Sequence, residues 1–294
     1  MRDYDIFMIH NDWHKYDKIA TIYDNVMVPH FFFRPAKDLF SILSLLQGAR
    51  VLDVGTGTGV GALIAKKIIG YEGLIVGLDF SIGMLKQASR KGLSTLVNGI
   101  VPGPPYQGSI FDGVVANLVL NHIHDYHAAI VDMIRVLRPG GKLGISTWGS
   151  KESEVDQAWQ SVADGFTEKG LVRQAVQQAL PWEEYFSDSG NLEEVLKSMD
   201  LERIDIKYKD YEIEMSTADY LEYKNHSLSG RLIAELLEFK LWEQFRQNLT
   251  KELEHIFGNQ VKFIKRVHFA IGVKTQFDQL TRASSRPRHI LVPD

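Results

Sequence analysis

The stretch VLDVGTGTG, from Val51 to Gly59, constrains the fold of this chain more than any other. It is an apolar strand that ends in a glycine-rich turn and leads directly into a helical pattern over 60–69. That order brings backbone N–H groups at a helix N-terminus close to a bound ligand. Glycines at alternate positions after an apolar run indicate positive φ or close approach of a ligand rather than packing alone. A nucleoside-containing cofactor is the first hypothesis.

A second apolar strand supports this hypothesis. It runs from Leu74 to Leu78 and ends in Asp79, twenty residues after Gly59. An acid at that place in a βαβ unit can accept hydrogen bonds from both ribose hydroxyls. The loop has G-x-G-x-G spacing and follows Asp53, whereas a pyrophosphate site has G-x-G-x-x-G spacing. A carboxylate there would repel a diphosphate and suit an ammonium group, so the pattern favours S-adenosylmethionine over NAD.

Four separated motifs resemble those of the class I S-adenosylmethionine-dependent methyltransferases. They are VLDVGTGTG at 51–59, VGLDFSIGML at 76–85, FDGVVANLVLNHIHD at 111–125 and RVLRPGGKLGIST at 135–147. The segment YDNVMVPHFFFRPAKDLF at 23–40 resembles the N-terminal helices of the small-molecule branch that includes the quinone-methylating enzymes. The resemblance implies an α/β fold, Rossmann-like and doubly wound, with a mostly parallel seven-stranded sheet.

The resemblance also implies a cofactor site for S-adenosylmethionine, with S-adenosylhomocysteine as the product. Asp53 would meet the ammonium group directly or through water, Asp79 the ribose, and Tyr23 would close the site over the methionine carboxylate. Two alternatives stay open: Asp79 as the N-cap of the helix over 81–91, and Tyr23 as a core residue. The remaining expected cofactor residues are Gly55, Thr56, Gly57, Gly59, Phe80, Met84, Asn98, Gly99, Asn117 and Leu118.

The exit of the third strand departs from the family pattern. The family usually has an acid near this point that binds the adenine amino group, and Ile100 stands there instead. Three possibilities follow: Asn98 reads the adenine, backbone groups around Gly99 read it, or the ring is held by apolar contact alone.

The segment NHIHDYH at 121–127 is the strongest candidate for catalysis. His122 or His124 could act as a base near a substrate hydroxyl, because imidazole titrates near neutral pH. Asp125 is expected to cap the following helix, and no metal site is expected. Methyl transfer from a sulfonium needs little beyond an in-line nucleophile, so the existence of a base stays open.

Composition limits the class of protein. The 294 residues are 45% hydrophobic, enough for one large core with additional helices. A net charge of −4 gives no long-range attraction to nucleic acid or to an anionic membrane. The chain has no Cys, which excludes disulfides and a thiolate nucleophile. No apolar run reaches the ~20 residues of a membrane span, and the N-terminus lacks a signal-peptide core. We expect a soluble, cytoplasmic chain; the oligomeric state stays open.

The order of patterns predicts the organisation of the domain. We expect strands at 50–54, 74–78, 94–97, 111–118 and 142–148, with helices at 59–69, 81–91 and 125–137. Later expectations are a strand at 202–214, a helix starting near Ser216, a helix over 231–257 and a strand at 267–271. We expect an N-terminal helical cap at 1–48, a core at 49–150 and 197–275, helical lid insertions at about 151–196 and 216–260, and a tail at 276–294.

The predicted function is methyl transfer from S-adenosylmethionine to an O, N or C nucleophile of a small, largely apolar acceptor, either a natural product or a quinone-like molecule. Large apolar side chains of the cap and lid should line the acceptor pocket: Phe31, Phe32, Phe33, Trp159, Phe166, Trp182, Tyr185 and Phe186. The alternative is a protein of this fold that binds the cofactor but catalyses a cyclisation or serves as a non-methylating partner.

Overall fold

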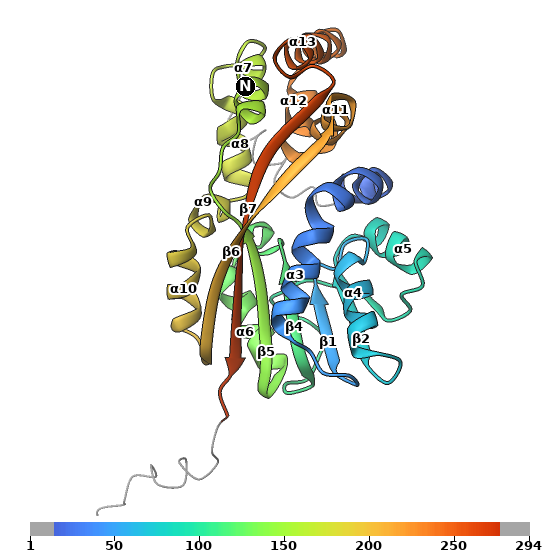
Figure 1. Ribbon diagram of the computed structural model, residues 1–294, viewed down its shortest axis with the longest axis vertical. Coiled ribbons are helices and arrows are strands. Elements are labelled where there is room, and N and C mark those ends of the chain that lie inside the picture. The colour runs from blue at the N-terminus through green and yellow to red at the C-terminus, as the bar shows by residue number, and fades with distance from the viewer. Residues whose placement is uncertain (1–14, 277–294) are drawn as a thin grey trace, which may run out of the picture.

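A seven-stranded sheet forms the centre of the molecule (Figure 1), for which a computed structural model describes residues 15–276. The strand order is β3-β2-β1-β4-β5-β7-β6. All pairs are parallel except those of β7, which is antiparallel to β5 and to β6. The predicted seven-stranded, mostly parallel sheet is confirmed. The strands are β1 (Arg50–Val54), β2 (Leu74–Asp79), β3 (Leu96–Asn98), β4 (Phe111–Asn117), β5 (Leu137–Trp148), β6 (Leu201–Ser216) and β7 (Gln260–Lys274).

The order of the strands places a ligand crevice beside β1. From β1 the chain builds outward through β2 and β3, and then returns to the other side of β1 to form β4. The last residue of β1, Val54, is in register with Leu78 on one side and Ala116 on the other. The carboxyl ends of these three strands therefore meet at one level, at the switch point where open α/β sheets bind ligands.

Both faces of the central strands are buried, which explains their continuous apolar sequences. Alternate residues of one strand belong to different cores: Val51 packs with α3 and α4, whereas Leu52 packs with α6. The helices of this half are α3 (Phe33–Leu43), α4 (Val60–Ile69), α5 (Ile82–Arg90) and α6 (Tyr126–Val136). The five predicted strands and three predicted helices of this region agree with the structure to within a few residues.

The helices of the N-terminal segment pack at one side of the sheet, against α5, and on one of its faces. Helix α2 (Lys15–Ile22) packs against α5, and the π-helix η1 (Tyr23–Phe32) connects it to α3. Helix α3 lies against α4 and β5 on the face of the sheet. The helical part of the predicted cap ends before residue 48: α3 ends at Leu43, because Ser44 takes the left-handed conformation with φ 49° and turns the chain toward β1. Residues 1–14 of the predicted cap lie outside the described residues.

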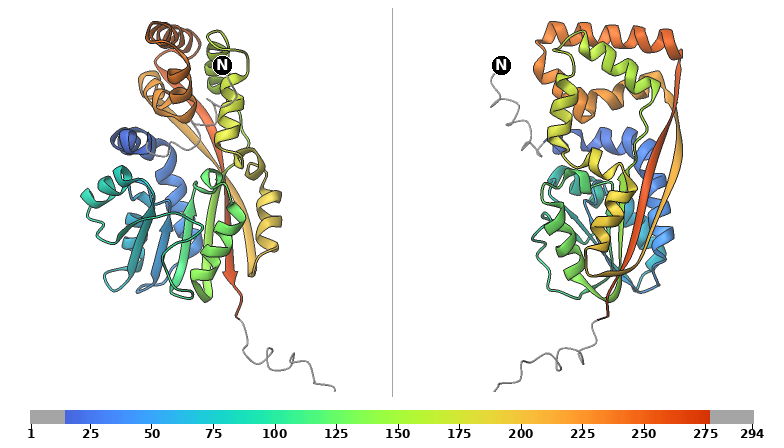
Figure 2. Two further views of the ribbon diagram at one scale, coloured as in Figure 1. Left: turned by 180° about the vertical axis from the view of Figure 1, so that it is seen from behind. Right: turned by 90° about the vertical axis from the view of Figure 1, so that its left-hand side faces the viewer.

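Strands β6 and β7 are longer than predicted and extend beyond the rest of the sheet (Figure 2). Residues 260–266 of β7 pair with β6 alone, since the pairing of β7 with β5 stops at Val267. Five helices pack around this extension, and we call them the helical cluster. They are α7 (Glu154–Asp164), α8 (Leu171–Ala179), α11 (Thr217–His226), α12 (Leu228–Leu236) and α13 (Phe239–Phe257).

Two details of the predicted insertions need correction. The single helix expected over 231–257 is divided into α12 and α13, because Leu237 and Glu238 are both extended. The short helix α9 (Glu183–Phe186) leads to α10 (Ser189–Lys197), which packs on β6 and β7 rather than in the helical cluster. The predicted helix start at Ser216 is confirmed, since its side chain accepts a hydrogen bond from the Asp219 N–H. Among residues 15–276, no helix is both long and apolar enough to cross a bilayer.

Candidate functional site

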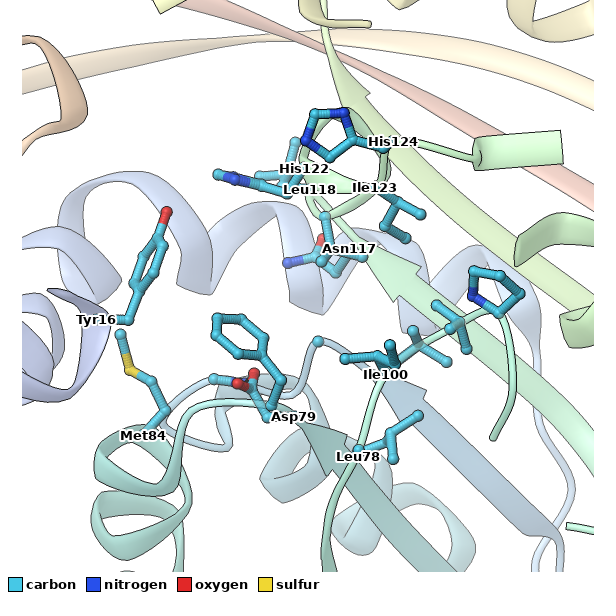
Figure 3. A pocket seen from close by; sticks show the side chains of 18 of the residues that line it. Tyr16, Leu78, Asp79, Met84, Ile100, Asn117, Leu118, His122, Ile123 and His124 are labelled. Carbon is cyan, nitrogen blue, oxygen red and sulfur yellow. Dashed lines mark hydrogen bonds between the residues drawn. The ribbon is translucent and has the colours of Figure 1, made fainter. Parts of the chain in front are cut away.

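A cavity of about 410 Å³ lies at the carboxyl ends of β1, β2 and β4 (Figure 3). It joins eleven of the residues predicted from the sequence: Tyr23, Gly55, Gly57, Asp79, Phe80, Met84, Gly99, Asn117, Leu118, His122 and His124. Four predicted cofactor residues do not line it: Asp53, Thr56, Gly59 and Asn98. The topology of the sheet thus gathers most of the candidates around one space, and the remaining four do not border it.

Glycine is required in the loop after β1 for two different reasons. At Gly55, φ is +66°, and an added Cβ would lie 2.4 Å from Cγ2 of Val119, itself part of the cavity wall. At Gly59, φ is +87°, and an added Cβ would lie 2.5 Å from Cδ1 of Leu93 on the opposite side. Gly55 keeps the loop narrow beside the cavity, whereas Gly59 allows the start of α4 to pack on its neighbours.

Asp79 is buried at the cavity edge and holds the glycine-rich loop in place. Its Oδ2 accepts a hydrogen bond from the Gly57 N–H at 2.8 Å, and its Oδ1 accepts one from the Ser81 N–H at 2.9 Å. Burial raises the pKa of Asp79, and these hydrogen bonds act in the opposite direction. The alternative of Asp79 as N-cap of the next helix is wrong: Ser81 caps α5, with its hydroxyl accepting from the Met84 N–H.

Asp53 lies behind the loop. Its Oδ2 accepts a hydrogen bond from the Thr56 hydroxyl at 2.7 Å, and the Ala62 N–H also donates to it. Burial raises the pKa of Asp53 to about 7, against the effect of these two donors. Asp53 does not line the cavity, so it could contact a ligand there only through an intervening group.

The region beyond β3 provides an apolar wall. Asn98, one candidate for reading the adenine, directs its Nδ2 to the backbone oxygens of Asp79 and Phe80, at 3.2 and 2.6 Å. Its amide nitrogen is thus used within the protein. The neighbouring residues Ile100, Val101 and Pro102 are apolar and line the cavity together with Leu78 of β2. This arrangement favours the third possibility, apolar contact with the ring.

The end of β4 is held in an unusual backbone conformation. Leu118 has φ +55°, uncommon for a residue with a side chain and found mainly where surrounding contacts impose it. Those contacts come from Ser146 on β5: its carbonyl and hydroxyl oxygens both accept from the Leu118 N–H, and its hydroxyl donates to Oδ1 of Asn117 at 2.8 Å. Ser146 therefore fixes how Asn117 and Leu118 face the cavity.

The two candidate histidines both line the cavity, in different environments. Burial, together with the charge of Arg231, lowers the pKa of His122 to about 4, so this ring is neutral at pH 7. The backbone oxygen of His124 accepts a hydrogen bond from Trp182. Asp125 caps α6 by accepting from the Ala128 N–H at 2.9 Å, as predicted. No group of three or more metal-binding side chains occurs in the described part of the chain.

Two tyrosines and a phenylalanine line the N-terminal side of the cavity and its border. The ring of Tyr23 stacks on Phe32 with centroids 5.0 Å apart and meets Tyr16 edge-on at 6.4 Å. Tyr16 also contacts His122, with ring centroids 6.0 Å apart. Burial raises the pKa of both tyrosines, so both hydroxyls are neutral at pH 7.

A second cavity, of about 660 Å³, lies between η1, the end of β5 and the helical cluster. Phe31, Phe32 and Tyr223 contribute aromatic surface, but Asp156, Glu183 and Lys265 line it as well. The lining of this cavity is therefore mixed, with both aromatic and charged side chains. Phe32 stands between the two cavities, stacked on Tyr23. Asn121, next to His122, donates a hydrogen bond to Glu183 at 3.0 Å. This bond connects the segment that carries His122 to the wall of the second cavity.

Most of the other aromatic residues expected at the acceptor pocket are structural. Trp159 and Phe186 are buried in the two cores, and Phe166 packs edge-on against Phe245. Trp182 and Tyr185 gather around Tyr126 instead, and Phe33 is 46% exposed. Aromatic content alone could not separate these positions, because core and pocket both select large apolar side chains.

Sequence reasoning missed Tyr16, Ser146 and Arg231. Ser146 lies within a recognised motif, so its position two residues before the end of β5 was available as a signal. Tyr16 and Arg231 lie in helices at opposite ends of the chain and carry no motif. Only the tertiary packing brings Tyr16 to the cavity and Arg231 to the Tyr16 ring.

The comparisons with known proteins agree with this arrangement. A family model described as a methyltransferase domain matches residues 52–145. Demethylmenaquinone methyltransferase of Shouchella clausii is 31% identical over 148 residues, which cover 48% of this chain and 60% of that protein. The enzyme of the same name from Staphylococcus epidermidis is 33% identical over 131 residues, covering 43% and 53%. The chain thus matches less than two thirds of the length of these relatives.

Solved structures support the fold. Phosphoethanolamine N-methyltransferase 2 of Haemonchus contortus, solved with S-adenosylhomocysteine, matches with a TM-score of 0.54 and 17% identity, covering 88% of this chain and 58% of that one. The YcgJ protein of Bacillus subtilis matches with a TM-score of 0.52 and 16% identity, covering 82% and 99%. Residues 52–145 therefore match a methyltransferase domain, and the chain resembles the demethylmenaquinone methyltransferases over somewhat less than half of its length.

Proposed function

We propose that this chain is a methyltransferase that binds S-adenosylmethionine in the first cavity and transfers its methyl group to a nucleophile of a small acceptor. The observation that carries the proposal is the position of this cavity at the switch point of the sheet, between the glycine-rich loop and Asp79. The domain match over 52–145 supports it, because the matched residues include this loop and Asp79.

The proposed placement of the cofactor follows from the chemistry of the walls. The adenine would lie between the apolar side chains around Ile100 and the ring of Phe80. The ribose hydroxyls would donate to Asp79, which already carries two backbone donors and has further acceptor capacity as a carboxylate. The methionine part would pass Gly55 and Gly57 toward Tyr23.

The sulfonium would then lie near Asn117, Leu118 and His122, where the two cavities approach each other. His122 is neutral at pH 7 and can accept a proton or a hydrogen bond from an acceptor hydroxyl. A pKa of about 4 makes it a weak base, so we assign it a hydrogen-bonding role and give positioning of the acceptor the larger share of the rate enhancement.

The second cavity is the proposed site for the body of the acceptor. Its aromatic side chains Phe31, Phe32 and Tyr223 suit a planar, ring-containing molecule. The relatives from Shouchella clausii and Staphylococcus epidermidis are named for a quinone acceptor, which supports a quinone-like or related aromatic compound here. The atom methylated, O, N or C, is decided by which nucleophile this cavity presents to the sulfonium. Residues 15–32 and the helical cluster would together act as its lid.

Calorimetry with S-adenosylmethionine, S-adenosylhomocysteine and NAD tests the cofactor proposal. We expect the first two ligands to bind and NAD not to bind. Incubation with labelled cofactor and a panel of quinols, phenols and aromatic amines then tests transfer, with S-adenosylhomocysteine as the measured product. Tight NAD binding without S-adenosylhomocysteine binding would refute the cofactor proposal, and cofactor turnover without label in any acceptor would refute the transfer proposal.

A further inference from the structure

Arg231 on α12 is a partly buried arginine that interacts with the Tyr16 side chain. Its Nε and Nη1 atoms are buried and make no hydrogen bond. No ion pair involving it is found within residues 15–276. Buried polar atoms are almost always hydrogen-bonded in native proteins, and a buried charge is normally paired. Two buried guanidinium nitrogens without a partner are therefore a feature that calls for a ligand.

The guanidinium lies beside the first cavity. Its Cζ is 5.2 Å from the centroid of the Tyr16 ring, and Tyr16 lines the cavity. Its charge also acts on His122, the residue that Tyr16 contacts. In Figure 3 the Tyr16 hydroxyl and the His122 ring lie on one side of the cavity, with Leu78 and Asp79 on the other. Arg231 is thus next to the end where the sulfonium is proposed to lie, away from the ribose end.

The position of Arg231 depends on a tight corner between α11 and α12. Ser227 ends the first helix and caps the second, with its hydroxyl accepting from the Gly230 N–H at 3.2 Å. A Cβ at Gly230 would lie 1.8 Å from the Lys224 carbonyl oxygen, so the two helices meet too closely for any other residue. The corner directs the next residue, Arg231, toward Tyr16.

The carboxylates near this end make their recorded hydrogen bonds with groups other than Arg231. The two carboxylates that act on Tyr16 are Asp79 and Glu183. Asp79 accepts from two backbone N–H groups, and Glu183 accepts from Asn121. Neither pairs with Arg231, and His122 and Tyr16 are neutral at pH 7. The sulfonium of a bound cofactor would add a second positive charge.

We propose that Arg231 binds an anionic oxygen group of the acceptor, a carboxylate or an ionised hydroxyl, so that the acceptor class is an aromatic oxyanion. This inference rests on the proposed function. A guanidinium presents a planar pair of N–H donors that matches a carboxylate, and such charge-assisted pairs are strong in a site shielded from water. Nε and Nη1 are the two buried nitrogens of Arg231 that have no hydrogen-bond partner within the described residues.

The test uses small probes with the full-length protein saturated with S-adenosylhomocysteine. The probes are 4-hydroxybenzoate and its uncharged analogue 4-hydroxybenzamide, with binding measured by calorimetry. A third probe, 4-nitrophenol, is titrated below and above the pKa of its hydroxyl. We expect 4-hydroxybenzoate to bind about tenfold or more tightly than the amide. Tighter binding of nitrophenolate than of nitrophenol would identify an ionised hydroxyl as a second accepted form.

Arg231→Gln should remove these preferences while leaving binding of S-adenosylhomocysteine unchanged. Arg231→Lys should keep part of them, because the charge remains and the planar donor pair is lost. Arg246→Gln is the matched control, since Arg246 is an exposed arginine of α13 that pairs with Glu243 and lines neither cavity. Equal binding of the benzoate and the amide, no binding of any probe, or a preference that survives in Arg231→Gln would overturn the inference. Loss of S-adenosylhomocysteine binding by the wild-type protein would instead refute the proposed function.

Thermal unfolding without probes separates a binding role from a structural one. Removal of an unsatisfied buried charge should leave the melting temperature of Arg231→Met equal to or above that of the wild type. The benzoate should raise the melting temperature of the wild type and not that of the variant. A large fall in the melting temperature of Arg231→Met would mean that Arg231 supports the packing of α12 on Tyr16, and the inference would fail.

Discussion

The cofactor side of the sheet and the helical cluster satisfy their buried charges in different ways. On the cofactor side, Asp53 and Asp79 accept hydrogen bonds from the glycine-rich loop and from the start of α5, all within about one βαβ unit. In the helical cluster, one carboxylate, Asp156 of α7, faces Lys224 of α11 at 3.8 Å and Lys265 of β7 at 2.8 Å. These three residues are far apart in the sequence and meet only after the chain has folded.

This difference shows which charge interactions can be predicted from a sequence. A charge satisfied by nearby backbone groups leaves a local pattern of fixed spacing, which the glycine-rich loop and Asp79 display. A charge satisfied by side chains from three distant elements leaves no pattern. The proposed acceptor site, which includes Arg231 and the second cavity, belongs to the latter kind, so the specificity of this chain is encoded where motifs are absent.

The largest effect is expected for Asp156→Ala, which tests whether the charges of the helical cluster depend on one another. Burial alone would raise the pKa of Asp156, but the charges of Lys224 and Lys265 outweigh it and hold the pKa at about 2. Burial lowers the pKa of Lys224 to about 8, because the carboxylates of Asp156 and Glu183 only partly offset it. Loss of the carboxylate leaves two ammonium groups together, one of them buried, and we expect a loss of about 3 kcal/mol or more of unfolding free energy in denaturant titrations.

The lowered pKa of Asp156 predicts that the stability of the protein depends on pH. The pKa of Asp156 is lower in the folded chain than its ordinary value of 3.8. Its stabilisation is therefore complete above about pH 4 and is lost as the pH falls through about 2. The control is Asp210→Ala, which removes an exposed carboxylate paired with Lys151 and Arg266 and should change stability far less. Equal losses in both variants would show that the cluster charges behave as surface charges.

On the cofactor side, Asp79→Ala should weaken S-adenosylhomocysteine binding by about 1.5–3 kcal/mol, the range for hydrogen bonds to a charged group. The variant also leaves the Gly57 and Ser81 N–H groups without their acceptor, so part of the loss reflects a less ordered loop. Ser81→Ala is the matched control: it removes the α5 cap and should cost about 1 kcal/mol of stability with little change in affinity. A folded Asp79→Ala protein with wild-type affinity would contradict the ribose contact.

Asp53 is expected to give a smaller effect, a pH dependence of stability and of cofactor affinity. Burial raises its pKa to about 7, above the ordinary 3.8. The neutral form is thus favoured in the folded chain, and its contribution to stability is full below about pH 4 and is lost as the pH rises through about 7. If a bound ammonium group favours the carboxylate, cofactor binding releases a proton, and affinity should fall by at most about tenfold per pH unit below pH 7. Calorimetry in buffers of different ionisation enthalpy measures this release, and Asp53→Asn should abolish it.

The smallest effect concerns exchange of backbone hydrogens. Residues 16–35 and 151–185, which border the second cavity, should exchange faster than β1, β2 and β4 in the free protein and become protected when cofactor and acceptor are bound. Mass spectrometry with and without ligands would report it. Equal, ligand-independent protection of both segments would assign them to the permanent core and would argue against a lid.

The accuracy of the predictions followed the range of the interactions behind them. The strands of the first half and the caps Ser216 and Asp125 were predicted correctly, because each depends on neighbours within a few residues. The division of the helix over 231–257 at Leu237 and Glu238 was missed, since both flanking segments have helical periodicity. The placement of Asp53 behind the loop was missed as well, because spacing gives its position in the loop but not the direction of its side chain.

The sequence by itself determined the parallel sheet, its switch point and the residues that meet there, because buried strands, glycine turns and helix caps are written in contiguous patterns. Only the tertiary structure decided which residues of the helical cluster lie across from this switch point. Strands β6 and β7 carry the helical cluster over the carboxyl edge, and this brings Arg231 to Tyr16 and Lys265 to Asp156. Such contacts depend on how whole elements pack, and the free energy of that packing is spread over many apolar side chains whose identities allow several arrangements.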